Sequence, residues 1–296
     1  MATFRERNDR KNRGEQGFSK GRGEPRERGG DPQKSHGGEA AHGGGLPPFR
    51  GKREVGSCWL WGRHAVEAAL LNPARRGDMR LVALRDRARE LEQVLARAGR
   101  ALRIEFVEPN DLARLLPQGA VHQGVALRPP PLEDVTVEEL GEEAKGVLLM
   151  LDQVTDPQNV GAILRSAAAF GARGVILQDR NAPQLGGALA KAAAGAVDKV
   201  PVARVTNLSR ALEKLSDLGW RSVGLAGEAD QTLEEALDSR PTVLVLGSEG
   251  EGLRRLVSEH CEALARIPMP GGFESLNVSN AAAVALYECT RKVDRG

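Results

Sequence analysis

The stretch VLLMLDQVTDPQNVGAILRSAAAFGARGVILQ, residues 147–178, decides the fold predicted for this chain. It contains two nearly continuous apolar runs, VLLMLDQV and GVILQ, and such runs are typical of strands that are buried on both faces. Between them, PQNVGAILRSAAAFG has the apolar spacing of a helix. Buried strands that alternate with helices predict an α/β fold with a parallel sheet covered on both sides. Ligands of such sheets bind outside the carboxyl ends of the strands.

The same alternation continues to the end of the chain. VLVLG is a third continuous apolar run, and LGGALAKAAAG, NLSRALEKLSDLG and LRRLVSEH have helical patterns. We also expect a strand just before Ile267 and a helix over the alanine-rich residues 281–286, with Ser279 or Asn280 as its N-cap. The pattern predicts one α/β domain over residues 147–296.

Residues 56–129 have the pattern of a second, smaller α/β domain. RLVAL, LRIEFV and GVALR predict strands, and GRHAVEAALLN, RARELEQVLARAGR and PNDLARLL predict helices. We expect order to begin near Cys58. Three consecutive prolines follow Arg128, and the acidic stretch after them predicts a linker with a helix over residues 130–146.

Residues 1–55 form a basic tail rich in glycine and arginine. Within it, residues 1–50 hold eleven Lys or Arg and seven Asp or Glu. The tail has too few apolar side chains to offset the entropy cost of ordering it, so we expect it to be disordered. Tails of this composition bind RNA through phosphate attraction and stacking. A solvated tail without a specific partner explains the composition equally well.

The composition excludes several other classes of protein. No apolar run approaches the roughly 18 residues of a transmembrane helix, and the N-terminus lacks the apolar core of a secretion signal. Three cysteines without CxxC spacing and five scattered histidines argue against a disulfide framework and against a metal site. The net charge of +2 does not by itself indicate a nucleic-acid partner. We therefore expect a cytoplasmic protein with no membrane segment and no metal.

Three segments follow strands and are candidates for a ligand site. In the first, Asp156 is a good N-cap and Pro157 a good first helical residue. Asn159 then lies in the first turn of the helix, near the carboxyl end of the preceding strand, and Arg165 lies off the apolar stripe. Periodicity alone favours the simpler interpretation of a capping asparagine and a solvated arginine.

The second candidate is the loop LGSEGEG, which contains Gly247, Gly250 and Gly252. It is not a Walker-type phosphate loop, because no GK[ST] ends the run, and it is not a dinucleotide fingerprint, because Arg255 occupies the third glycine position. What remains is a loop that brings bare backbone close to a ligand. Glu249 within it also suits the N-terminus of a helix.

The third candidate is GGFESLNVSNAAAVALYE, residues 271–288, which follows the stiff, extended stretch IPMP. It brings four small polar side chains to the start of an apolar helix, namely Ser275, Asn277, Ser279 and Asn280. Capping the helix accounts for one of them but not for all four.

In this order, the three segments closely resemble the motifs of the SpoU (TrmH-type) 2′-O-ribose RNA methyltransferases of the SPOUT class, over about residues 147–291. A weaker resemblance covers residues 57–128, where GRHAVEAAL and HQGVAL look like the small substrate-binding domain of the ribosomal-RNA branch. The resemblance implies a parallel sheet with a C-terminal trefoil knot, preceded by a small α/β RNA-binding domain. It also implies S-adenosylmethionine (SAM) as cofactor, RNA as partner and a homodimer.

The resemblance also implies the residues of the site. Those that would line the cofactor pocket, largely through backbone, are Leu246, Gly247, Ile267, Met269, Leu276 and Asn277. Those implied in catalysis are Arg165, Asn159, Glu249, Ser275 and Asn277. A guanidinium stays protonated at ordinary pH, so we expect Arg165 to hold a substrate phosphate and to stabilise charge on the ribose oxygen. Ser275 and Asn277 would orient the ribose, and Glu249 would restrain Arg165 or an adjacent loop.

The predicted function is methyl transfer from SAM to a ribose 2′-hydroxyl of RNA, at a guanosine of large-subunit (23S-type) ribosomal RNA. One alternative is a transfer-RNA guanosine 2′-O-methyltransferase, although that branch usually lacks the front domain. Another is a non-catalytic RNA-binding protein of the same fold, against which the intact Arg165 and Asn277 argue. A nicotinamide-dependent oxidoreductase is disfavoured by the broken glycine fingerprint.

Overall fold

The computed structural model describes residues 58–272 and 275–293 of the chain. The tail predicted over residues 1–55 lies outside these residues. Within the described part, no helix is both long enough and apolar enough to span a membrane.

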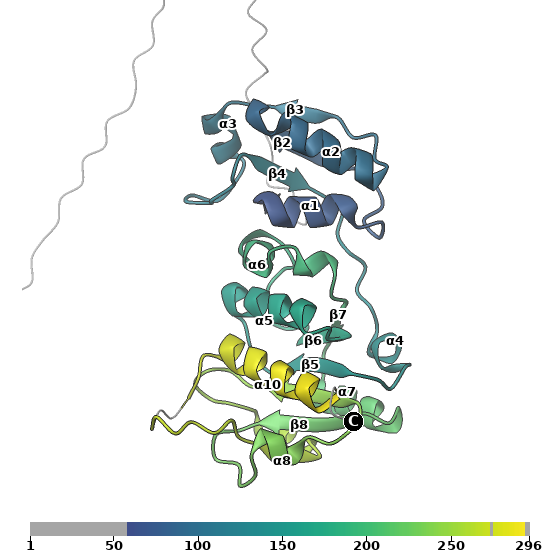
Figure 1. The fold of residues 1–296 in the computed structure, drawn as a ribbon, viewed down its shortest axis with the longest axis vertical. Coiled ribbons are helices and arrows are strands. Elements are labelled where there is room, and N and C mark those ends of the chain that lie inside the picture. The colour runs from purple at the N-terminus through teal and green to yellow at the C-terminus, as the bar shows by residue number, and fades with distance from the viewer. Residues whose placement is uncertain (1–57, 273–274, 294–296) are drawn as a thin grey trace, which may run out of the picture. The chain divides into compact units, whose positions relative to one another are not determined.

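A six-stranded sheet forms the centre of the C-terminal part (Figure 1). Its strands are β5 (Val147–Leu151), β6 (Gly174–Gln178), β7 (Val202–Val205), β8 (Arg221–Leu225), β9 (Thr242–Leu246) and β10 (Ala263–Ala265). They lie in the order β10-β8-β9-β5-β6-β7, and every neighbouring pair is parallel. The parallel sheet is thus confirmed, and the three runs predicted as buried strands, β5, β6 and β9, are its central neighbours.

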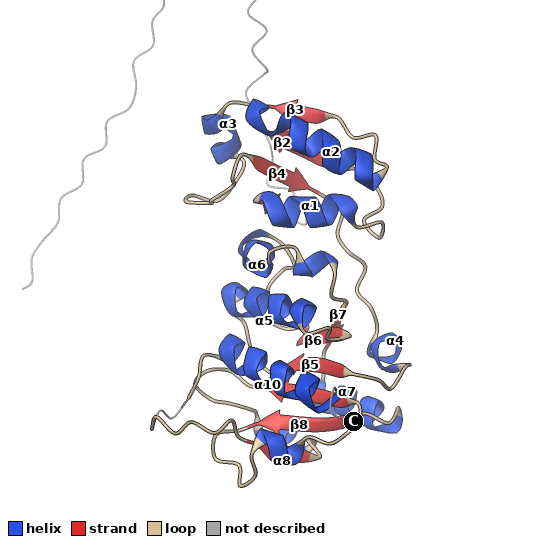
Figure 2. Cartoon of the chain, viewed as in Figure 1, coloured by secondary structure: helices blue, strands red, loops and turns tan. Residues whose placement is uncertain are grey.

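Helices cover both faces of this sheet (Figure 2). The helices of the C-terminal part are α4 (Val137–Gly141), α5 (Pro157–Ala169), α6 (Gly187–Ala193), η2 (Ala196–Asp198), α7 (Leu208–Asp217), α8 (Leu233–Ala236), α9 (Arg255–Glu259) and α10 (Val278–Val293). Of these, α6 and η2 pack on α5 and not on a face of the sheet. Leu149 and Leu151 of β5 belong to the buried cluster with α5 and α10, whereas Leu148 and Met150 belong to the cluster with α4 and α7. Alternate side chains of one strand therefore enter two cores, which explains its continuous apolar run.

Two strands of this sheet were not predicted. β7 lies at one edge of the sheet and contains Arg204, and β8 begins with Arg221 and Ser222. Neither strand has the uninterrupted apolar run of the central strands, because fewer of its side chains enter a core. The strand expected before Ile267 is present as β10.

The N-terminal part contains a four-stranded sheet with helices against it. Its elements are β1 (Leu60–Trp61), α1 (Arg63–Leu71), β2 (Arg80–Ala83), η1 (Arg85–Arg87), α2 (Ala88–Ala98), β3 (Ile104–Phe106), α3 (Pro109–Arg114) and β4 (Val125–Arg128). The strand order is β1-β4-β2-β3, with β2 parallel to β3 and antiparallel to β4. Each predicted helix and strand is present, whereas the two-residue β1 is too short to have produced a pattern.

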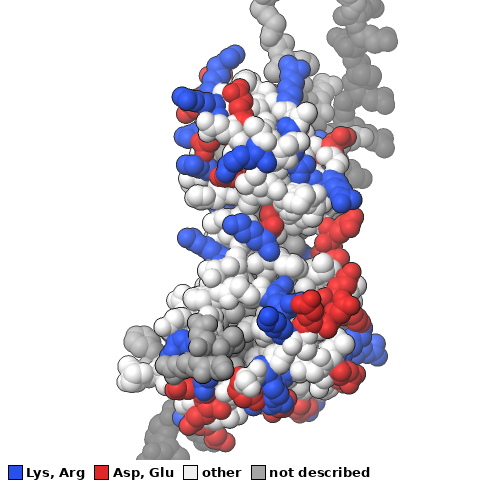
Figure 3. Space-filling model, turned by 45° about the vertical axis from the view of Figure 1, so that its right-hand side comes forward, with Lys and Arg blue, Asp and Glu red and all other residues white. Residues whose placement is uncertain are grey.

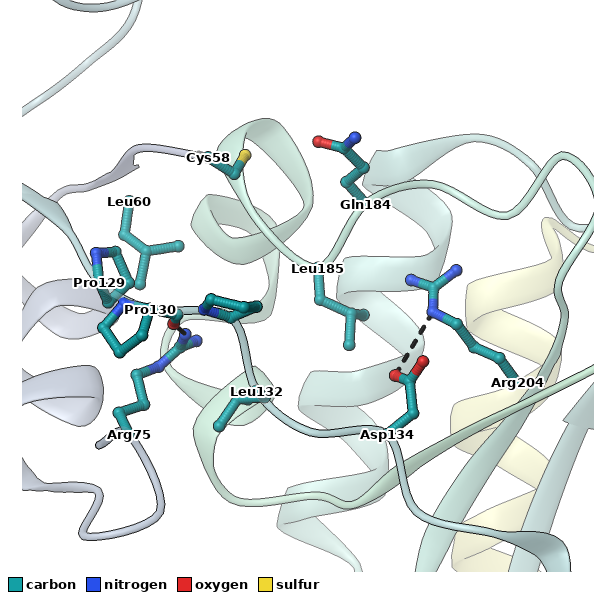
Figure 4. Close-up of a pocket in the computed structure, with 11 residues that line it drawn as sticks. Cys58, Leu60, Arg75, Pro129, Pro130, Leu132, Asp134, Gln184, Leu185 and Arg204 are labelled. Atoms are coloured by element: carbon teal, nitrogen blue, oxygen red, sulfur yellow. Dashed lines mark hydrogen bonds and ion pairs between the residues drawn. The ribbon is translucent and has the colours of Figure 1, made fainter. Parts of the chain in front are cut away.

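A buried arginine, Arg75, ties the N-terminal part to the segment after β4, through Pro130 (Figure 4), and to η2, through Asp198. Arg75 is 3% exposed, and its guanidinium donates hydrogen bonds to Asp198 at 2.6 and 3.2 Å and to the carbonyl of Pro130 at 2.7 Å. Asn72 Nδ2 donates to the same carboxylate at 3.0 Å. Since both charges are satisfied inside the protein, this contact fixes the start of the linker. A cavity of about 240 Å³ lies beside it, away from the three candidate segments.

Candidate active site

The three candidate segments leave the large sheet at the same edge. β5 and β9 are parallel neighbours whose last residues, Leu151 and Leu246, are paired. β10 is also parallel and ends at Ala265, which is paired with the end of β8. The segments after β5, β9 and β10 therefore all start at the carboxyl edge of the sheet, where ligands of parallel sheets bind.

Three predicted site residues, one from each segment, form a hydrogen-bonded cluster. Asn159 Nδ2 donates to Glu249 Oε1 at 2.8 Å, and Asn277 Nδ2 donates to Asn159 Oδ1 at 3.0 Å. Asn277 Nδ2 also donates to Glu249 Oε1. Residues 118 positions apart in the chain thus contact each other directly.

The starts of two helices position this cluster. Asp156 caps α5 by accepting hydrogen bonds from the backbone N–H groups of Gln158 and Asn159, as predicted. For α10 the predicted cap was wrong, since Asn277 Oδ1 accepts hydrogen bonds from the backbone N–H groups of Ser279 and Asn280 at 3.0 and 3.3 Å. The helix begins at Val278, earlier than the alanine run suggests, and the cap directly precedes it.

Glu249 complements the N-terminus of α10. Its Oε1 accepts a hydrogen bond from the backbone N–H of Val278 at 3.3 Å. A carboxylate is stabilised at this position by the partial positive charge of the helix end. Glu249 therefore joins the glycine-rich loop to α5 and α10, and its hydrogen bonds engage those segments and not Arg165.

Arg165 is exposed on α5, and its side chain has no hydrogen bond or ion pair within the described part of the chain. It lies six residues after Asn159, or about 9 Å further along the helix axis. Helical side chains tilt toward the N-terminal end of their helix, so its guanidinium can extend back in the direction of the cluster. Ser275 is also exposed and has no hydrogen-bond partner among the described residues. Both side chains are available to a ligand.

The residues predicted to line a cofactor pocket fall into two groups. Leu246 is buried in the core, and its carbonyl oxygen accepts a hydrogen bond from the backbone N–H of Asp152 at 2.8 Å. Ile267 and Met269 are half-buried, and Leu276 is 38% exposed. Among the described residues, no hydrogen bond engages the backbone N–H or C=O of Ile267 or Leu276. Their backbone groups are thus available to hydrogen-bond the edge of a nucleoside, and their apolar side chains can pack against its face.

Gly247 is required by the shape of the glycine-rich loop. Ser248 and Gly252 exchange backbone hydrogen bonds at 3.0 and 3.1 Å, which folds the loop back on itself. A Cβ atom on Gly247 would lie 2.0 Å from the carbonyl carbon of Gly252, whereas a Cβ on Gly250 would meet nothing within 4 Å. Gly247 therefore allows a close approach between the two ends of the loop itself, near Gly252.

We expect Gly247→Ala to destabilise the protein by about 1–3 kcal/mol, because the new methyl group can be accommodated only if the loop opens. The matched variant Gly250→Ala should change the free energy of unfolding by less than about 0.5 kcal/mol. Urea unfolding followed by circular dichroism measures both. Equal stabilities of the two variants would contradict the role assigned to Gly247.

An ion pair between a buried aspartate and a partly exposed arginine lies beside this loop and was not predicted. Asp152 is 0% exposed, and it accepts hydrogen bonds from the backbone N–H of Arg254 at 2.9 Å and from Arg254 Nε at 2.7 Å. Arg254 Nη2 also donates to Gln178 Oε1 at 3.1 Å. The pair anchors the end of the glycine-rich loop to the ends of β5 and β6. The feature of the sequence that could have indicated this ion pair is the aspartate that directly follows the apolar run VLLML.

The two thiols of the C-terminal part are not nucleophiles at neutral pH. Burial, with a contribution from the negative charge of Asp152, raises the pKa of Cys261 to about 12. Burial and then Glu288 raise the pKa of Cys289 to about 12. Since the thiolate is the reactive form, neither of these cysteines is a candidate nucleophile for the site.

The fold and the site define a class of α/β proteins. Its members have a parallel sheet with a polar site where three strands end, and a smaller α/β part precedes this sheet in the chain. Residues 146–287 match the model of the SpoU rRNA methylase family, and residues 59–135 match that of RNA 2′-O ribose methyltransferase substrate binding. The chain belongs to the SpoU rRNA methylase family.

Relatives and solved structures agree with this membership. The chain is 43% identical over 240 residues to the 23S rRNA (guanosine-2′-O-)-methyltransferase RlmB of Pseudomonas aeruginosa, which covers 79% of this chain and 96% of that one. It is 43% identical over 209 residues to an uncharacterised tRNA/rRNA methyltransferase of Mycolicibacterium smegmatis, which covers 69% of this chain. It spans 65–66% of the length of that relative and of two others from Mycolicibacterium species.

The SpoU methyltransferase AviRb of Streptomyces viridochromogenes in complex with the cofactor AdoMet has a similar structure. The TM-score is 0.68 at 26% identity, and the match covers 83% of this chain and 95% of AviRb. The AdoMet-bound rRNA methyltransferase of Sinorhizobium meliloti matches with a TM-score of 0.66 at 25% identity, over 79% of this chain and 87% of that one.

Proposed function

We propose that this protein transfers a methyl group from SAM to the ribose 2′-hydroxyl of a guanosine in large-subunit ribosomal RNA. The observation that carries the proposal is the hydrogen-bonded cluster of Asn159, Glu249 and Asn277, which brings the three candidate segments together. Asn159 lies on α5, the helix that also bears Arg165. The relative from Pseudomonas aeruginosa, named for this reaction, supports the choice of substrate because it matches along 96% of its length.

SAM is the proposed cofactor, as it is in the AdoMet complexes of AviRb and of the protein from Sinorhizobium meliloti. It supplies a methyl group that is already activated on a sulfonium. Gly247, Ile267, Met269 and Leu276 would hold it, the unpaired backbone of Ile267 and Leu276 binding its polar edges. The side chain of Leu246 is buried, so it would support the glycine-rich loop from the core and not contact the cofactor directly.

In this mechanism the protein supplies alignment and charge. Holding the 2′-oxygen in line with the methyl group can account for roughly 7–11 kcal/mol of the barrier. Arg165 would hold the substrate phosphate and donate hydrogen bonds to the 2′-oxygen as negative charge develops there. Ser275 and Asn277 would orient the ribose, and Glu249 keeps Asn159 and Asn277 in position through its hydrogen bonds.

The proposal includes the organisation of the chain. A tail over residues 1–55 precedes an RNA-binding domain over 56–129, a linker over 130–146 and a SAM-binding domain over 147–296 whose C-terminal segment forms a trefoil knot. A homodimer would cover the exposed apolar side chains of α10, Val284 and Tyr287, the latter of which lies edge-on against Phe170. The protein would act in the cytoplasm and without a metal.

Transfer of labelled methyl groups tests the proposal. The full-length protein should label a large-subunit ribosomal RNA transcript in the presence of methyl-labelled SAM, and 2′-O-methylation mapping should place the label on a guanosine. A transcript with 2′-deoxyguanosine at that position should accept none. Label on transfer RNA alone would replace the substrate proposed here, and SAM binding without any transfer would favour the non-catalytic alternative.

A further inference from the structure

A second cavity, of about 280 Å³, lies in the N-terminal part between α1 and α2. Its floor is apolar and is formed by the buried side chains of Leu91, Val94 and Val125. Its rim is polar and is formed by Arg63, Glu67, Arg87, Glu90 and Gln123. The volume is close to the lower end of the range for small-ligand pockets, about 300 Å³, so the cavity has room for one planar ring system.

Glu90 is the central polar group of the rim. It is 31% exposed and lies between two guanidinium groups, with Arg63 Nε 2.5 Å from its Oε1 and Arg87 Nη1 3.6 Å from its Oε2. A carboxylate has about four lone-pair directions, so these two contacts leave acceptor capacity on both oxygens. The cavity therefore offers a fixed negative edge flanked by two planar cations.

The segment His122–Gly124 closes one side of the cavity. Gln123 has a left-handed backbone, with φ +54°, and its Oε1 accepts hydrogen bonds from the backbone N–H of Arg63 at 3.0 Å and from Lys191 Nζ at 3.1 Å. A Cβ atom on Gly124 would lie 3.1 Å from Arg87 Cγ, so the glycine lets the arginine pack over the loop. Within the part of the chain that the structure describes, the buried Arg87 Nε has no hydrogen-bond partner. This Nε lies 3.7 Å from Asp86 Oδ2, so the guanidinium end of Arg87 is what the rim offers to a ligand.

We propose that this cavity binds one unpaired guanine base of the RNA substrate, an inference that rests on the proposed function. The apolar floor suits the face of a base, and sequence-specific proteins read unpaired RNA bases by stacking and by hydrogen bonds to their edges. Guanine alone among the four bases carries two adjacent donors, N1–H and the 2-amino group, on its Watson–Crick edge, and these match the two oxygens of Glu90. Its O6 and N7 are acceptors for an arginine.

The charge of the surrounding surface suits RNA. Residues 58–128 hold twelve arginines, no lysine and eight acidic residues. Figure 3 shows basic side chains over this part of the molecule. Arginine combines charge with a planar group that stacks on bases and pairs with phosphates, which distinguishes it from lysine. A guanine in the cavity would therefore lie within a surface that also attracts the flanking backbone.

Short oligoribonucleotides test the proposal by fluorescence anisotropy with the full-length protein. The sequence UUGUU should bind roughly tenfold more tightly than UUIUU, in which inosine lacks the 2-amino donor, because a hydrogen bond to a charged group is lost. UUAUU should bind no better than UUIUU. In Glu90→Gln the preference for guanine should fall to about onefold, whereas the matched variant Glu92→Gln, an exposed glutamate on the same helix, should retain it.

A second variant separates recognition from structure. Arg63→Ala breaks the same ion pair as Glu90→Gln but leaves the carboxylate, so it should keep the ratio between guanine and inosine even where overall affinity falls. Equal binding of UUGUU and UUIUU by the wild type, or no binding of either, would overturn the proposal, as would loss of the preference in Glu92→Gln. Methyl transfer to ribosomal RNA by the wild type is measured separately, so failure of the proposed function is distinguishable from failure of this pocket.

Discussion

Arg165→Ala is expected to lower kcat for methyl transfer by roughly 10²- to 10³-fold, the usual effect of removing one donor that stabilises charge in a transition state. The guanidinium is exposed and makes no hydrogen bond or ion pair within the described residues, so its removal should not unfold the protein. The affinity for SAM, measured by calorimetry, should stay nearly unchanged, because none of the residues proposed to hold the cofactor has a hydrogen bond or ion pair with this side chain among the described residues. Steady-state transfer of labelled methyl groups gives kcat.

The matched control is Arg210→Ala, which removes an exposed arginine from α7. It should leave kcat within about twofold, since a surface substitution away from the site changes little. A kcat for Arg165→Ala similar to that of the control would contradict the catalytic role. Arg165→Lys then distinguishes two mechanisms: retained activity means that a positive charge suffices, whereas an equal loss means that the planar fork of donors is needed.

Arg254→Ala is expected to destabilise the protein by about 2 kcal/mol, because it leaves the buried carboxylate of Asp152 without its counter-charge. The loss is smaller than for a fully buried pair, since the Arg254 side chain is 38% exposed. One hydrogen bond, from the backbone N–H of residue 254, would remain. For a protein of this size, a loss of this magnitude corresponds to a decrease in Tm of roughly 4–8 °C. Differential scanning calorimetry without ligand measures it.

The neighbouring residue provides the control for this second variant. Arg255 is 79% exposed and pairs with Glu259 one turn along α9, and such pairs contribute about 0.3–0.5 kcal/mol. Arg255→Ala should therefore shift Tm by no more than about 2 °C. If Arg254→Ala proved as stable as Arg255→Ala, the pair of Arg254 with Asp152 would not be what anchors the glycine-rich loop.

The contrast between these two arginines shows the limit of sequence patterns. Arg254 and Arg255 are consecutive and chemically identical, and the pattern LRRLVSEH places both in a helix. In the structure, Arg254 precedes the helix and pairs with a residue 102 positions away, whereas Arg255 pairs within its own helix. Periodicity describes local spacing and carries no information on a partner so distant in the chain.

The sequence by itself determined the class of fold and singled out three segments that the structure brings together. Continuous apolar runs specify strands that are buried on both faces, and Asp156 with Pro157 specifies where α5 begins, because these preferences are local. Motif order then pointed to Arg165, Asn159, Glu249 and Asn277. Only the tertiary structure decided that Glu249 binds the two asparagines and the start of α10, that Asn277 is the cap, and that Asp152 is buried beneath the loop. Apart from the cap, which is local to the start of α10, these contacts depend on which strands are neighbours in the sheet. Strand order is set by packing of the whole chain and not by any single segment.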